Sequence, residues 1–498
     1  MTNQVTKAIE ATSLFMRADK AALVALVAII CIALPSCTIG PDYVRHDPVL
    51  PKAFQSEVGK NSDGVMPKDE WWKEFNDPPL DQLIDGALKD APSLELAEAR
   101  IRSARAMRGI AGAATSPDLN LGAEYHRSHG SDNVPTGVPP GGMGPGITSN
   151  LWQTGFDSTW ELDIFGANRR AVEAANAEVS AYEFDLTDIR LTLIADIIRT
   201  DIEARTAAQR LQIAVNLRQI EQERMDLIQV LVKSGLASIL DLHAARARVQ
   251  AAGAVIPQMQ DDLRGARFRM AALTGGSPDA LPRDFPLATR LPEPNLTFSA
   301  GLPSDLLKRR PDLRAAERRL ASANARVGVA QADLYPHFSL TGIVGLESLQ
   351  FSTLQTGSST YYAAGPSLGW NIFDAGKVRF EVMDATARKD AEAAIYRAAV
   401  LNALRDAESA LDHVGDTQLR LRELDTEKAA YLDSACDASL LYRRGIDSYL
   451  PVLDAEIAAL QSTDRSFQGQ RDALLALVSL YKSVGGSWNV ESGSLPTP

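Results

Sequence analysis

Residues 160–169 read WELDIFGANR, and residues 370–379 read WNIFDAGKVR. The tryptophan, the glycine and the last arginine of the first stretch recur in the second, 210 positions later (160 to 370). The same displacement relates six downstream residues to six in the second half, namely Gly235, Ser238, Leu240, Ala245, Gly275 and Gly276 to Gly445, Ser448, Leu450, Ala455, Gly485 and Gly486. Upstream the match continues at a displacement of 219 (92 to 311). A register held over so long a distance indicates one large unit present twice, and not a stack of short repeats.

Each copy predicts a helix, two strands and a very long helical hairpin. Between Gly166 and Gly235 there is neither glycine nor proline, and between Gly376 and Gly445 only Gly415 interrupts a proline-free stretch. About 65 residues of helix extend close to 100 Å at 1.5 Å per residue. Glycine favours the left-handed turn that ends a helix, so Gly235 and Gly445 are expected to lie at the tips of the two hairpins.

The long helices carry apolar seams with one charged interruption each. Spacings of three and four relate Ile213, Leu217, Ile220, Arg224, Leu227 and Leu231, and likewise Leu421, Leu424, Lys428, Tyr431, Ala435, Ala438 and Tyr442. Such spacing is typical of coiled-coil packing.

Four segments alternate between apolar and polar residues, as β-strands with two different faces do. They are expected at about 117–127, 150–164, 336–348 and 360–373. Their length of about ten residues and their aromatic ends are typical of strands in a membrane β-barrel, although alternation alone also fits an ordinary half-buried sheet. Four strands cannot close a membrane barrel, since about eight is the smallest number known. Two chains would supply 8 and three would supply 12, and strand counting leaves both open.

The N-terminus predicts an export signal. An apolar stretch, Ala21–Leu34, follows Arg17 and Lys20 and is too short to span a bilayer as a helix. It ends at Leu-Pro-Ser-Cys37, which resembles a bacterial lipobox, so Cys37 is expected to carry lipid after cleavage. The alternative is cleavage elsewhere, with Cys37 as a free thiol. Translation is expected to start at Met1 or at Met16.

Composition and motifs argue against several classes of function. The formal net charge of −12 and the absence of a basic stripe exclude nucleic acid as a partner. The six histidines are scattered, and the chain lacks the short signatures of metalloproteases, serine hydrolases and phosphate-binding loops, so it is not expected to be an enzyme. Cys436, the one cysteine left beside Cys31 and Cys37, is expected to be a buried small apolar residue.

The domain organisation expected from these patterns is linear. It comprises a signal peptide (1–36), a lipidated N-terminal segment (37–79), repeat 1 (80–276, with its hairpin at about 167–274), a proline-rich connector (277–302), repeat 2 (303–486, with its hairpin at about 377–484) and a C-terminal tail (487–498).

Three motifs occur together in this duplicated chain: CTIGPDY at 37–43, the Trp71-Trp72 pair followed by Phe75, Asp77 and Leu80, and the tip YRRGIDSYLPVLDA at 442–455. In combination they resemble the TolC/OprM-type outer-membrane efflux channels (outer membrane factors), in their lipoprotein, NodT-like branch. The resemblance implies a mostly α-helical chain with a membrane β-barrel. Three chains would form a 12-stranded barrel, four strands per chain, continued by a long coiled-coil-like α-helical barrel.

The same resemblance implies a passive export duct for small molecules, the outer-membrane channel of a tripartite efflux pump in a Gram-negative bacterium. The implied partners are two further copies (a homotrimer), a periplasmic adaptor (membrane fusion protein), an inner-membrane transporter of the RND type and outer-membrane lipid. No cofactor is expected beyond the covalent lipid on Cys37. The alternatives are the outer-membrane conduit of a type I-like protein secretion system and a periplasmic adaptor lipoprotein, which would have one hairpin and a lipoyl-like β domain.

By resemblance, the periplasmic gate maps onto Tyr442, Leu450 and Asp454, with Asp447 as a further acid. A ring of carboxylates at a narrow mouth selects cations, and a ring of leucines excludes water. The alternative roles are local: Asp447 or Ser448 as the cap of the returning helix, Asp454 as a solvated charge and Leu450 as a packing residue. The first tip is plainer in composition, so the two tips are expected to differ in gating.

Overall fold

The structure is a computed structural model that describes residues 38–45, 48, 50–56, 70–133, 146–279, 281, 285–286, 290–292 and 303–486. The predicted signal peptide (1–36), Cys37 and the C-terminal tail lie outside these residues, as does most of the connector.

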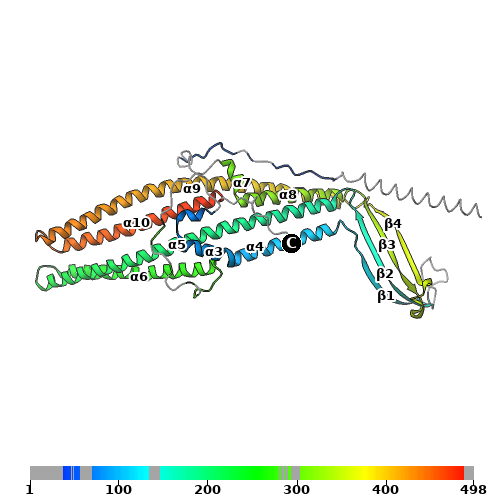
Figure 1. Cartoon of the computed structure of the whole chain (residues 1–498), viewed down its shortest axis with the longest axis horizontal. Coiled ribbons are helices and arrows are strands. Elements are labelled where there is room, and N and C mark those ends of the chain that lie inside the picture. Colours follow the sequence, from blue (N-terminus) through cyan, green and yellow to red (C-terminus); the bar gives the residue numbers. More distant parts are fainter. Residues whose placement is uncertain are drawn as a thin grey trace, which may run out of the picture. The chain divides into compact units, whose positions relative to one another are not determined.

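The described chain repeats one order of elements. The first copy contains α4 (Pro92–Ala113), β1 (Asn120–His129), β2 (Thr148–Leu162), α5 (Ala167–Lys233) and α6 (Ile239–Leu273). The second contains α8 (Pro311–Ala332), β3 (His337–Ser348), β4 (Thr360–Gly369), α9 (Lys377–Arg443) and α10 (Leu450–Ser483). Short elements precede each copy, namely η1 (Trp71–Phe75), α3 (Pro78–Asp90), η2 (Pro303–Asp305) and α7 (Leu306–Arg309), and two single turns, η3 (Phe351–Thr353) and η4 (Gly357–Ser359), link β3 to β4. Figure 1 shows these elements along the chain.

The compact units do not follow the two repeats. One unit combines residues 103–179 and 318–393 with the N-terminal residues up to Arg45, and therefore contains all four strands. The other combines 46–102, 180–317 and 394–498, and therefore contains both helical tips. Each unit takes parts from both copies, because equivalent segments of the two repeats pack together.

The strands form one antiparallel sheet in the order β1-β2-β3-β4. The register places the apolar residues of neighbouring strands opposite one another: Leu121 pairs with Phe156, Phe156 with Val344 and Val344 with Tyr362. These four side chains are between 47% and 83% exposed in the single chain. An apolar face open over all four strands is what a lipid-facing sheet requires.

The opposite face of the sheet is polar. The Asn120 amide donates to Asp157, Gln153 donates to the Tyr361 hydroxyl at 2.6 Å, and His337 contacts Glu161 at 2.8 Å. The predicted faces are therefore right, but two predicted strand ends are wrong. Strand β1 begins at Asn120 and not at 117, where Pro117 has no N–H to donate. Strand β4 ends at Gly369 and not at 373, because Asp374 already accepts the N–H groups that begin α9.

The core of the helical unit is built on α5. Leu191, Ile194, Ile198 and Ile202 are fully or almost fully buried against η1, α3 and α10. The Trp71 ring stacks on Tyr481 with 4.7 Å between centroids, and the Tyr481 hydroxyl donates to Glu74 at 2.6 Å.

A buried charge cluster lies within this core. Arg205, 1% exposed, forms ion pairs with Asp201 and Asp77 and donates to the Arg290 carbonyl at 3.0 Å. Asp77 also caps α3 by accepting from the Leu80 N–H. Burial raises the pKa of Asp201 to about 6, although Arg205 lies beside it.

The outer parts of the hairpins are less covered. Arg224 and Lys428, the charged interruptions of the seams, are partly buried. Cys436 is exposed, so its predicted burial is wrong: it lies beside the seam residue Ala435, on the outer side of α9. Among the described residues, no helix has the length and apolar character needed to cross a bilayer.

The raised pKa of Asp201 has a measurable consequence. Its pKa in the folded chain, about 6, lies above the ordinary aspartate pKa of 3.8, so this group stabilises the fold below pH 3.8 and loses that contribution as the pH rises through about 6. Between these pH values the free energy of unfolding should fall by about 1.4 kcal/mol per pH unit because of Asp201. We expect Asp201→Asn to remove this decrease. Thermal unfolding between pH 4 and 7 measures it, with Asp261→Asn, an exposed acid on α6, as the control. Parallel pH profiles for wild type and Asp201→Asn would contradict the assignment.

Candidate functional site

The two hairpin tips share one turn geometry. Gly235 and Gly445 have φ values of +75° and +71°. In the first tip, the Gly235 N–H donates to Val232 and the next N–H donates to Leu231; in the second, Gly445 donates to Tyr442 and the next N–H to Leu441. This bonding is a Schellman motif, which closes the C-terminus of a helix. No described atom lies within 4 Å of a Cβ added at either glycine, so the left-handed backbone, and not crowding, requires glycine there.

The helices that return from the tips begin differently. Ser238 caps α6 in a capping box with Asp241, at 3.3 Å and 2.9 Å. In the second tip Tyr449 precedes α10 and makes no side-chain cap, so the predicted cap by Ser448 or Asp447 is wrong. Asp447 instead accepts the adjacent Ser448 N–H at 2.7 Å. The reason is the helical backbone of Tyr449, since a side-chain cap needs an extended residue at this position.

Asp454 pairs with the other hairpin. Its Oδ1 lies 2.9 Å from Nη1 of Arg224 on α5, and the carboxylate is 53% exposed whereas Arg224 is only 16% exposed. Glu221 lies 4.0 Å from the same guanidinium nitrogen. The solvated side of Asp454 leaves it able to interact with ions as well as with Arg224.

Leu450 also contacts the first hairpin. It packs against a small apolar cluster formed by Ile228 of α5 with Leu242 and Ala245 of α6. Leu450 and Asp454 lie one helical turn apart on α10, so the same face of this helix makes both contacts. In the single chain, an ion pair and an apolar contact therefore link the two tips.

The Tyr442 ring packs, at a tilt, against a residue that sequence reasoning did not single out. Its ring centroid lies 4.9 Å from that of Tyr449, at an interplanar angle of 42°. Burial, followed by the nearby charges of Glu456 and Glu223, raises the pKa of Tyr449. The aromatic pair spans the second turn and connects the end of α9 to the start of α10.

Arg224 is the second residue that was missed as a site residue. The sequence did indicate a role for Arg224, because a charged residue within an apolar seam needs a partner. Lys428, the equivalent interruption in α9, contacts Asp425 and Ser466 at 3.2 Å and 3.1 Å.

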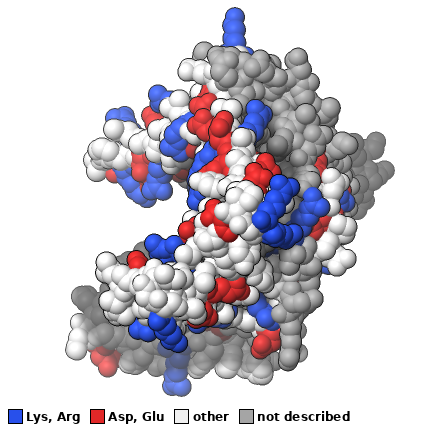
Figure 2. Space-filling model, turned by 90° about the vertical axis from the view of Figure 1, so that its left-hand side faces the viewer, with Lys and Arg blue, Asp and Glu red and all other residues white. Residues whose placement is uncertain are grey.

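The face of the molecule at the helix tips has mixed charge. Figure 2 shows acidic and basic side chains interspersed around a hollow, with neither sign forming a continuous patch. A tightly held ion or a polyanion would require a concentrated patch. Among the described residues, no group of three His, Cys, Asp or Glu side chains could hold a metal ion.

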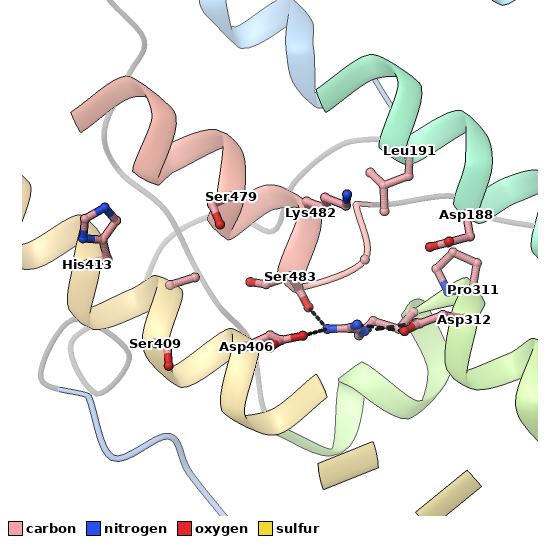
Figure 3. A pocket seen from close by; sticks show the side chains of 13 residues that line it. Asp188, Leu191, Pro311, Asp312, Asp406, Ser409, His413, Ser479, Lys482 and Ser483 are labelled. Atoms are coloured by element: carbon pink, nitrogen blue, oxygen red, sulfur yellow. Dashed lines mark hydrogen bonds and ion pairs between the residues drawn. The ribbon is translucent and has the colours of Figure 1, made fainter. Parts of the chain in front are cut away.

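A cavity of about 560 Å³ lies elsewhere in the helical unit, between α5, α8, α9 and α10. The Arg310 guanidinium in its wall contacts Asp312 at 2.7 Å and 3.0 Å, the Ser483 carbonyl at 3.0 Å and Asp406 at 3.9 Å (Figure 3). Burial and the nearby Asp312 raise the pKa of Asp188 on α5. Arg310 therefore joins three elements, and its bonds give it a structural role.

A family model described as outer membrane efflux protein matches residues 83–276 and 302–486, once for each copy of the repeat. The chain belongs to this family. The outer membrane efflux proteins are transport proteins and not enzymes, and this member is an outer-membrane channel component of an efflux pump.

Relatives and solved structures agree over nearly the whole chain. Nodulation protein T of Rhizobium leguminosarum bv. viciae is 32% identical over 86% of this chain and 86% of its own. The pyoverdine export outer membrane protein OpmQ of Pseudomonas putida is 30% identical over 89% of this chain and 93% of its own. The structure of the outer-membrane channel OprN superposes with a TM-score of 0.81 and 35% identity, over 91% of this chain and 100% of that one.

The pair between Arg224 and Asp454 can be tested locally. An exposed ion pair contributes up to about 1 kcal/mol, so Arg224→Met should increase local opening of residues 450–456 by up to about fivefold. Hydrogen exchange followed by mass spectrometry measures it. Arg264→Met, which removes an exposed pair on α6, is the control. Unchanged exchange at 450–456 would show that the pair does not hold the tips together.

Proposed function

We propose that three copies of this chain close their sheets into one 12-stranded barrel and form a single export duct. The observation that carries the proposal is the open sheet: β1 pairs only with β2 and β4 only with β3 among the described strands. Lipid does not tolerate such edges, and four strands are too few to close alone. The likeness to the OprN channel over its full length supports closure by further copies.

The helical hairpins fit the wall of this duct. The helices α5 and α9 have 67 residues each, and three chains would contribute six hairpins of similar length. A wall of this kind needs no catalytic residue, because transport along it is passive. We further propose a tripartite pump, in which a periplasmic adaptor joins the duct to an inner-membrane transporter of the RND type. The toluene efflux pump protein TtgI of Pseudomonas putida, 30% identical over 92% of this chain, supports export of small molecules.

The tips are proposed as the gate of the duct. Leu450 and Asp454 connect the hairpins within one chain, so opening has to break or move these contacts. The contact of Tyr442 with Tyr449 bridges the turn between α9 and α10. Asp447 adds negative charge near the mouth but makes no ion pair in the described chain, and its effect should be smaller.

Cys37 is proposed as the site of a lipid anchor. It directly precedes Thr38, the first described residue, and follows the apolar segment Ala21–Leu34. A single acyl chain binds membranes weakly, whereas an acylated chain that also inserts a barrel is held by both.

The gate can be tested by conductance in planar bilayers. We expect the purified protein to show a small, cation-preferring conductance that rises in Asp454→Ala and in Leu450→Ala, because each removes a contact between the tips. Asp447→Ala is the matched acid and should change conductance less. A protein that conducts under no condition would refute the channel gate.

Lipidation can be tested with labelled palmitate. The wild type should incorporate the label, Cys37→Ala should not, and Cys436→Ser should retain it. We expect Cys37→Ala to assemble still, because the barrel itself holds the chain in the membrane. A wild type without lipid would refute the anchor and leave the channel proposal standing.

A further inference from the structure

The segment that follows Cys37 is bound along its length by one buried arginine. Arg170, with a side chain 4% exposed, donates to the Ile39 carbonyl at 3.2 Å and the Gly40 carbonyl at 3.1 Å, and contacts Asp42 at 2.7 Å. Its remaining terminal nitrogen pairs with Glu173 at 2.7 Å. The guanidinium thus uses all three nitrogens, two of them on the backbone of the N-terminal segment.

Other groups complete this binding site. The Ile39 N–H donates to the Phe165 carbonyl at 3.0 Å, and the Asn324 amide donates to the Pro41 carbonyl at 2.8 Å. The Arg318 guanidinium lies 5.7 Å from the centre of the Tyr43 ring. Residues 38–43 are therefore held by α5, by α8 and by the connection between β2 and α5.

Three glycines allow the close approach. A Cβ on Gly166 would lie 2.8 Å from Thr38, one on Gly328 would lie 3.0 Å from the Ile39 carbonyl oxygen, and one on Gly40 would lie 2.4 Å from the Gly328 Cα. Any side chain at Gly40 would overlap the backbone of α8. We call Arg170, Asn324, Gly166 and Gly328 the N-terminal seat.

The duplicated wall does not require this seat. At the equivalent place in the second copy, Phe380 replaces Arg170 and is 67% exposed. Gly109, the counterpart of Gly328, has no described atom within 4 Å of a Cβ. The arginine that donates to the N-terminal segment at one corner is therefore not repeated at the equivalent corner.

We propose that the N-terminal seat fixes the membrane depth of the lipid anchor. This inference rests on the proposed acylation of Cys37 and on the proposed membrane sheet. Cys37 directly precedes Thr38 in the chain, so no residue separates the proposed lipidation position from the segment that the seat binds. The seat is at the corner where β2 ends and α5 begins, so the acyl chains and the sheet enter the lipid at the same level. Arg170 acts as the positioning residue.

The test uses the acylated full-length protein in bilayers of phosphatidylethanolamine and phosphatidylglycerol. A spin label on Val44→Cys, in a Cys436→Ser background, reports the mobility of the segment and its depth from collisions with oxygen and a nickel chelate. Val44 is 65% exposed and can carry the label. Wild type should show an immobile label at one depth. Because hydrogen bonds to a charged group are strong, Arg170→Met should raise the mobile fraction about tenfold and spread the depth.

Arg388→Met is the matched control, since it removes an arginine that is 76% exposed and pairs with the exposed Asp384. It should leave mobility and depth unchanged. Asn324→Ala removes one hydrogen bond to the segment and should increase the mobile fraction less than Arg170→Met does. This second variant keeps the test valid if Arg170→Met does not fold. An immobile label in both seat variants would overturn the seat. Missing palmitate on wild type would instead refute acylation, while the mobility result would still report on the seat.

Discussion

Every backbone N–H and C=O group within a bilayer needs a partner in the protein, because lipid offers none. In this chain the outer sides of β1 and β4 have no strand beside them among the described residues. Leu121, Phe156, Val344 and Tyr362 of the four strands share one face, and Asn120, Asp157 and Glu161 lie on the other, so the sheet already has a lipid side and an inner side. What it lacks is closure, and further copies of the same sheet can supply it. A closed wall is made of similar parts, and this gives a physical reason for the duplication within the chain.

The proposed gate and the proposed attachment of the N-terminal segment lie where the two copies differ in structure. At the tips, the first returning helix has a capping box, whereas the second begins without a side-chain cap and presents Leu450 and Asp454 to the first hairpin. At the other end of the long helices, Arg170 binds the N-terminal segment, whereas Phe380 is exposed. Leu450 recurs from Leu240, whereas Asp454 of the proposed gate and Arg170 of the proposed attachment have no counterpart in the other copy.

Charged residues within apolar surroundings specify how the helices pair. Arg205 in the core, Arg224 in the α5 seam and Arg310 beside the cavity each contact acids on other elements. Such pairs contribute little net stability, because desolvation offsets the attraction. These pairs instead keep the helices in register. Long helices with regular seams can slide past one another by a turn, and a buried arginine that pairs with an acid on another element opposes this sliding.

The sequence by itself determined the duplication, the long helices, the two faces of the sheet and the glycine turns at 235 and 445. These features depend on periodicity and on local backbone stereochemistry, which a linear pattern records. Tertiary structure decided the partner of Asp454, 230 positions away at Arg224, the contact between Tyr442 and Tyr449, the exposure of Cys436 and the seat around Arg170. It also decided that each compact unit mixes both copies. The reason is physical: which side chains meet across two helices depends on how the hairpins pack, and no spacing within either helix carries that information.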